Sequence, residues 1–98
     1  MTAYIVLIRN ETHDPEGMKA YAALAPKAPI DQLEIAAAKT NWFEVLEGEE
    51  AEAVVILKFP DRKAANRWYR SPEYQAAVKH RLASGSYRTV MVEGVDTA

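Results

Sequence analysis

Residues 59–74 have the sequence FPDRKAANRWYRSPEY. A strand is expected to end here, because Pro60 cannot donate a backbone hydrogen bond to a neighbouring strand. Asp61 can cap a helix that runs to about Tyr69. The Ser-Pro-Glu run at residues 71–73 then offers a second cap, a proline at the first helical position and an early acid. The stretch therefore predicts a strand end followed by two consecutive helices.

Short apolar runs on both sides of this stretch are rich in β-branched and aromatic residues and predict strands. The runs are AYIVLIR (3–9), WFEVLE (42–47), AVVILKF (53–59) and YRTVMVE (87–93). Residues 48–50 (Gly-Glu-Glu) are typical of a turn, so the second and third runs are expected to pair as a hairpin. Residues 30–40 leave two alternatives open, a helical turn leading into a strand or a strand alone.

An Asp-Pro-Glu sequence at residues 14–16 predicts another helix start, and this helix is expected to end near Pro26. The last helix is expected to stop at Gly85. The resulting order is strand, helix, strand, strand, helix pair, strand, which is the pattern of ferredoxin-like folds. Residues 1–98 are thus predicted to form one α+β domain, with an antiparallel βαββαβ sheet that carries its helices on one face.

Both faces of the predicted sheet are apolar, so the face without helices needs a second cover. A symmetric homodimer, with sheets packed against each other, is a common way to cover such a surface. The sequence therefore predicts a homodimer of the dimeric α/β-barrel type. Leu7 and Leu57 are expected on the shared face, where an introduced charge would disrupt the dimer.

Composition excludes several classes of protein. The chain has 98 residues, of which 49% are hydrophobic and 27% charged, a balance typical of one folded domain. The formal charge is −2, with Lys and Arg scattered among acids, which disfavours nucleic acid as a partner. No apolar run approaches the roughly 20 residues that span a bilayer. No basic segment precedes the first apolar run, so we expect a cytoplasmic protein that does not enter the membrane.

The histidines, His13 and His80, offer little metal chemistry. The chain has no cysteine, and their spacing matches no metal motif, so neither a metal nor a cofactor is expected. His13 is predicted in a solvated loop. His80 lies near the end of a predicted helix, where the dipole favours a protonated imidazole, and is otherwise a weak candidate for acid–base catalysis together with Tyr74.

Two arginines are candidates for binding an anionic group. Arg9 ends an otherwise apolar strand, and Arg81 shares a helix face with Tyr74, so both are expected to point inward. Each either pairs with a carboxylate of the protein or presents its planar guanidinium to a ligand. The carboxylates considered as partners of Arg9 are those of Glu44, Glu47 and Glu93.

Tyrosine side chains combine an apolar ring with a polar tip, a mixture that either packs helices on a sheet or lines a small-molecule pocket. Tyr69 and Tyr74 are open to both interpretations. The predicted ligand-binding residues are Arg9, Tyr69, Tyr74 and Arg81.

Several of these runs also occur together in a known family. They are EVLEG (44–48), VVILKFPD followed by A-x-x-W-Y-x-S-P-E-Y-Q (between Val54 and Gln75), Arg81, and VEG (92–94). With them the chain resembles the family called domain of unknown function 1330, in the dimeric α/β-barrel superfamily. Members usually carry glycines and an arginine ahead of EVLEG, whereas this chain has AAAKTNW, with Lys39 near the arginine position. The resemblance implies a small dimeric ferredoxin-like protein and brings no assigned activity.

Three hypotheses of function follow. The first is a cytoplasmic homodimer that holds a small apolar or carboxylate-bearing molecule between helices and sheet. The second is a cofactor-free enzyme, of the monooxygenase or isomerase kind that the superfamily includes. The third is a structural or interaction module in which both arginines are paired.

Overall fold

The computed structural model describes residues 1–28, 32–38 and 42–95. These residues form an antiparallel four-stranded sheet with the strand order β2-β3-β1-β4, together with helices that follow the predicted order. The elements are β1 (Ala3–Thr12), α1 (Pro15–Leu24), the 3-10 helix η1 (Ala25–Lys27), β2 (Glu34–Ala37), β3 (Ala53–Phe59), α2 (Arg62–Tyr69), α3 (Pro72–Ser84) and β4 (Gly85–Glu93). The predicted α+β class and ferredoxin-like arrangement are confirmed.

The predicted helix caps are in place. Asp14 Oδ1 accepts a hydrogen bond from the Glu16 amide at 3.1 Å at the start of α1. Asp61 Oδ1 accepts from the Ala64 amide at 2.8 Å at the start of α2, and Ser71 Oγ caps α3. Because each cap satisfies an otherwise unpaired amide, it fixes where its helix begins.

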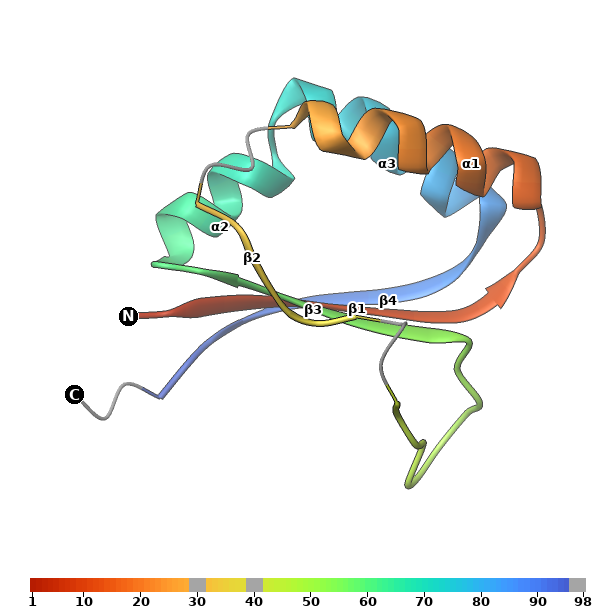
Figure 1. Cartoon of the computed structure of the whole chain (residues 1–98), viewed down its shortest axis with the longest axis horizontal. Helices are drawn as coiled ribbons and strands as arrows, with labels where there is room; N and C mark the ends of the chain where they lie inside the picture. Colours follow the sequence, from red (N-terminus) through yellow and green to blue (C-terminus); the bar gives the residue numbers. More distant parts are fainter. Residues whose placement is uncertain (29–31, 39–41, 96–98) are drawn as a thin grey trace.

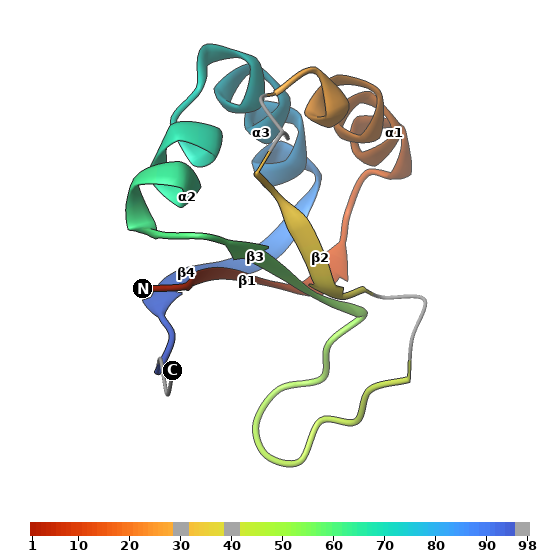
Figure 2. The same cartoon turned by 60° about the vertical axis from the view of Figure 1, so that its left-hand side comes forward.

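In the described parts of the chain, the α-helices lie on one face of the sheet and leave the other face open (Figures 1 and 2). Strand alternation directs every second side chain toward the helices. The most buried side chains gather between these two layers, and their aromatic members come from β3, α2 and α3. They include Ile5, Leu57, Phe59, Ala65, Trp68, Tyr74 and Val78.

The open face carries apolar side chains other than those expected. Leu7 and Leu57 are buried under the helices, so their predicted place on the second face is wrong. Because side chains alternate along a strand, the residues next to Leu7 and Leu57 point to the open face instead. Among them, Val6 lies opposite both Ile56 of β3 and Val90 of β4. Both faces are apolar, so the sequence pattern did not distinguish the covered one.

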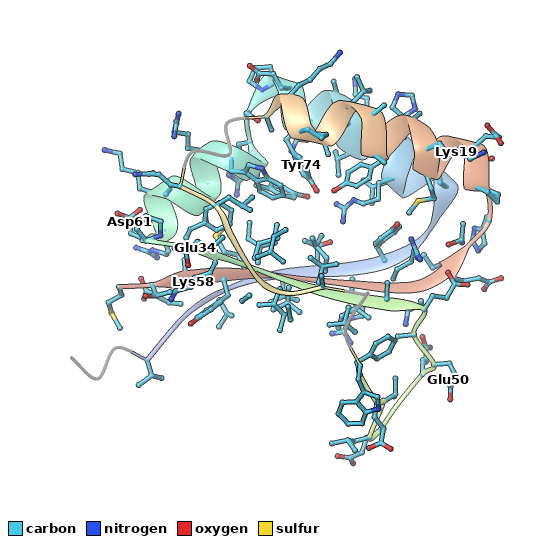
Figure 3. All side chains as sticks on the ribbon, in the orientation of Figure 1. Lys19, Glu34, Glu50, Lys58, Asp61 and Tyr74 are labelled. Carbon is cyan, nitrogen blue, oxygen red and sulfur yellow. The ribbon has the colours of Figure 1, made fainter. Side chains whose placement is uncertain are left out.

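The predicted hairpin strand at residues 42–47 is also wrong. The strand that pairs with β3 is β2, which lies within residues 30–40, where the sequence allows a helical turn leading into a strand or a strand alone. Glu34 lies opposite Lys58 in this pair. Residues 42–52 instead leave the sheet on the side opposite the helices, and Glu50, labelled in Figure 3, lies on this loop. A strand needs a free edge as well as β-propensity, and β2 occupies this edge of β3. Lys39 lies outside the described residues.

β4 begins where the backbone of Gly85 lies very close to the backbone of β1. Gly85 ends α3 as predicted, and β4 begins at this residue, two residues before the predicted strand. It pairs with Thr12 beyond a register shift in β1. A Cβ atom here would lie 2.4 Å from the Glu11 carbonyl oxygen, so only glycine lets the two backbones meet.

Candidate functional site

A cavity of about 410 Å³ lies between α1 and the helix-facing side of the sheet. This volume is within the range of small-molecule sites. Strand β1 supplies Leu7 and Arg9, and Tyr87 of β4 stands beside Arg9. The other lining residues are Met18, Lys19, Tyr21 and Ala22 of α1, Ala53, Val55 and Leu57 of β3, and Arg81 of α3.

Arg81 is the most unusual residue in the lining. Its side chain points inward as predicted, and only 2% of the residue is exposed. Nη1 donates a hydrogen bond to Thr89 Oγ1 at 3.3 Å. Nε and Nη2 are buried, and among the described residues they have no hydrogen-bond partner and no carboxylate that forms an ion pair with them.

Aromatic rings surround the Arg81 guanidinium. Its central carbon lies 4.8 Å from the centre of the Tyr87 ring and 5.6 Å from that of Tyr21. Both distances are within the range of cation–π contacts, which offset part of the cost of burying a charge. They give Nε and Nη2 no hydrogen-bond acceptor, so the arrangement is suited to an added anion.

Arg9 lies in the same cavity but has an acidic partner. Its Nε is 3.3 Å from Glu52 Oε1, close enough for an ion pair, although the angle does not give a hydrogen bond. Thr12 Oγ1 donates to the same oxygen at 2.7 Å and holds the carboxylate in place. The expected pairing of Arg9 with Glu44, Glu47 or Glu93 is wrong, because Glu52 directly precedes β3, next to the end of β1.

Tyr74 stands behind the cavity wall. It is fully buried, and Figure 3 shows it pointing from α3 toward the sheet. Its hydroxyl is 2.7 Å from that of Tyr21, which does line the cavity. Burial raises the pKa of the Tyr74 hydroxyl far above its usual value, and the neighbouring Tyr21 raises it further. Tyr74 therefore keeps its proton at neutral pH and positions the Tyr21 hydroxyl.

Tyr69 does not line this cavity. It is half-buried, packs against the rings of Trp68 and Tyr74, and borders a smaller hollow of about 150 Å³. The structure thus brings Arg9 and Arg81 to one cavity, with Tyr74 behind its wall and Tyr69 outside it.

Neither histidine lines the cavity. His80 is exposed on α3, where its backbone carbonyl accepts a hydrogen bond from Ser84 Oγ. The His13 side chain is exposed, with Nε2 3.8 Å from Glu11 Oε2. In the described parts of the chain, no group of three or more His, Asp or Glu residues could hold a metal ion. No helix in those parts is long and apolar enough to cross a membrane.

Met18, Tyr21 and Tyr87 line the cavity and were not among the predicted binding residues. Met18 and Tyr21 belong to an apolar stripe of α1, which is equally typical of simple packing. In the structure Tyr87 donates its hydroxyl hydrogen to Met18 Sδ at 3.1 Å, and burial raises the pKa of this hydroxyl. The spacing of these apolar residues does not predict that a cavity separates α1 from the sheet.

The model of one protein family, "Domain of unknown function (DUF1330)", matches residues 2–95. The chain belongs to this DUF1330 family. The resemblance noted in the sequence is thereby confirmed. Comparison with curated protein sequences gives no significant match.

Solved structures share the fold of this DUF1330 protein. The RPA0582 protein of unknown function from Rhodopseudomonas palustris is 24% identical, with a TM-score of 0.66 over 97% of this chain and 83% of that one. A dimeric ferredoxin-like protein of unknown function from Jannaschia sp. CCS1 is 18% identical, with a TM-score of 0.64 over 96% and 100%. SnoaB, a cofactor-independent oxygenase from Streptomyces nogalater, is 12% identical, with a TM-score of 0.56 over 98% and 94%. At these identities the similarity establishes the fold alone.

Proposed function

We propose that this DUF1330 protein is a homodimer that binds a small, mostly apolar molecule bearing an acidic group in the cavity between α1 and the sheet. The observation that carries the proposal is the buried Arg81, which lines the cavity and has two donor atoms without a hydrogen-bond partner among the described residues. Native proteins rarely leave such groups unpaired, because each buried and unsatisfied donor costs about 1–3 kcal/mol, and more when it is charged. A bound acid removes this cost.

The composition of the lining supports the same function. Leu7, Val55 and Leu57 offer an apolar surface to the body of a ligand, while Arg81 offers charge and hydrogen bonds. This combination of apolar walls with few polar groups is typical of small-molecule sites. The proposed binding residues are therefore Arg81 and Arg9, with Tyr21 and Tyr87 in place of the predicted Tyr69 and Tyr74.

The dimer is proposed from the open face of the sheet. Val90 and Val92 are each 48% exposed there, and an apolar sheet face is an association surface. Structural neighbours from Jannaschia sp. CCS1 and Bacteroides fragilis are described as dimeric with a ferredoxin-like fold. Their assembly supports the same state for this chain. A cytoplasmic location stays a prediction from the sequence.

The other hypotheses are less well supported. A purely structural module requires both arginines to be paired within the protein, and Arg81 is not paired with any described carboxylate. A cofactor-free enzyme stays a prediction, but His80 and Tyr74 do not line the cavity as its proton carriers would. Such an enzyme would have to use Tyr21 or Tyr87 as its proton carrier, because both residues line the cavity.

Native mass spectrometry of the purified protein tests the proposed cavity. We expect a dimer that carries an extra small mass, which is released on denaturation. Ala22 lines the cavity and is exposed on α1, so Ala22→Phe should fill the cavity without disturbing the core and should abolish the extra mass. Ala23→Phe is the matched control, because Ala23 is exposed next to it but does not line the cavity.

The control variant should carry the same extra mass as the wild type. Equal ligand occupancy in Ala22→Phe and Ala23→Phe would show that the molecule binds elsewhere. An empty dimer in every preparation, even after incubation with a bacterial small-molecule extract, would contradict the proposed binding function.

A further inference from the structure

The charges around the cavity do not balance. Its lining includes three cationic side chains, those of Arg9, Lys19 and Arg81, and no acidic one among the described residues. Arg9 is neutralised by Glu52 at 3.3 Å. The Lys19 side chain is 75% exposed, and its Nζ lies 3.2 Å from Glu16 Oε1. Water and Glu16 therefore screen the charge of Lys19. Among the described residues, the charge of Arg81 has no compensating acidic side chain.

The hydrogen-bonding state of Arg81 adds a geometric constraint. Nη1 already donates to Thr89, while Nε and Nη2 have no partner among the described residues. These two nitrogens lie side by side along one edge of the planar guanidinium and donate in parallel. That edge matches the spacing of the two oxygens of a single carboxylate, which accepts both hydrogen bonds at once.

From the charge balance and this edge together, we propose that the ligand is a monocarboxylate with an apolar body, bound through both oxygens to Nε and Nη2 of Arg81. This inference rests on the proposed binding function and names its ligand class. The apolar body lies against Leu7, Val55 and Leu57, which line the same cavity.

A second negative charge is excluded by what lines the rest of the cavity. The other cations of the lining are Arg9, which Glu52 already neutralises, and Lys19, whose charge Glu16 and water screen. The Glu52 carboxylate would repel a second anionic group beside Arg9, and elsewhere the walls are mostly apolar. Burying an unpaired charge against such walls is strongly unfavourable. Dicarboxylates and phosphate monoesters, which carry close to two charges at neutral pH, should therefore bind weakly.

Calorimetric titration with three ligands of one chain length tests the inference. The ligands are octanoate with one charge, octanedioate with two charges, and uncharged octanamide. We expect octanoate to bind at least about 10-fold more tightly than either of the others, because hydrogen bonds to charged groups contribute about 1.5–3 kcal/mol. Arg81→Met keeps an apolar side chain of similar length and should remove this preference. Arg62→Met, at a largely exposed arginine outside the cavity, should keep it.

A second variant weakens the discrimination against a second charge and leaves Arg81 in place, so it keeps the test informative if Arg81→Met folds poorly. Glu52→Gln removes the charge that neutralises Arg9, while the amide oxygen can still accept the hydrogen bond of Thr12. In this variant we expect octanedioate to gain about 10-fold in affinity relative to octanoate.

The outcomes separate the inference from the function on which it rests. Equal binding of octanoate and octanamide by the wild type would leave the apolar binding cavity standing and overturn the monocarboxylate assignment. Octanedioate binding as tight as that of octanoate would also overturn it. Failure of all three ligands to bind would contradict both the inference and the proposed function.

Discussion

At the scale of single residues, Arg81 combines two properties that are rarely found together. It is as inaccessible as the apolar core, yet two of its donors lack a partner among the described residues. Removing a charge from water costs several kcal/mol, whereas a desolvated cation–π contact returns about 2 kcal/mol. The rings of Tyr21 and Tyr87 therefore offset part of the cost of burying the guanidinium charge but accept no hydrogen bond from Nε or Nη2. A bound ligand would supply the missing acceptors.

The buried hydroxyl of Tyr74 predicts a stability loss in alkaline solution. Its pKa is raised in the folded protein, chiefly by burial, whereas in the unfolded chain it is about 10. Below pH 10 both states hold the proton, and this contribution to stability is fully present. Above pH 10 the unfolded state loses the proton first, so the free energy of unfolding falls by up to about 1.4 kcal/mol per pH unit.

Urea unfolding between pH 8 and pH 11.5 measures this effect. Tyr74→Phe should lose about 1 kcal/mol at neutral pH, because the Tyr21 hydroxyl loses its partner at 2.7 Å. Above pH 10 the stability of the variant should fall less steeply than that of the wild type. Parallel curves for the two proteins would show that Tyr74 does not stay protonated in the folded state.

At the scale of helices and strands, local chemistry predicted some boundaries and not others. The caps at Asp61 and Ser71 act within one turn of the chain, so residue types at fixed spacing were enough to place α2 and α3. The partner of β3 depends instead on which of two apolar segments reaches its edge. Ile35 and its neighbours do so, while residues 42–47 have a similar pattern and lie off the sheet. Strand propensity alone cannot decide between such segments.

In the candidate site, too, features set by one helix were predictable from the sequence, whereas features set by the packing of separate elements were not. The inward direction of Arg81 follows from its position on the Tyr74 face of one helix, and the sequence predicted it. Tyr69 belongs to the preceding helix, and the bend between α2 and α3 places it over a different hollow. The sequence did not identify Glu52 as the partner of Arg9. The two residues come together because the chain enters β3 beside the end of β1, and residue spacing in the sequence does not predict that arrangement.

At the scale of the whole molecule, the open sheet face predicts how the protein assembles. Val90 is 48% exposed on that face, and Leu82 is 58% exposed on α3, across the molecule. Both positions are accessible in one chain, so a charge at either should leave the fold intact. Val90→Asp should yield a monomer by light scattering after size-exclusion chromatography, because it buries a charge in an apolar interface. Leu82→Asp should remain a dimer.

A dimer of unchanged stability in Val90→Asp would show that the open face is not the interface. Monomer formation by Leu82→Asp alone would place the interface on the helices. A monomeric wild type would contradict the dimer itself.

The binding of a carboxylate by Arg81 is the central claim, and a crystal structure of the protein with octanoate tests it most directly. We expect both carboxylate oxygens within about 2.7–3.0 Å of Arg81 Nε and Nη2, with the alkyl chain against Leu7 and Val55. Ordered water on both nitrogens with octanoate bound elsewhere, or a protein carboxylate from a second subunit on that edge, would contradict the claim.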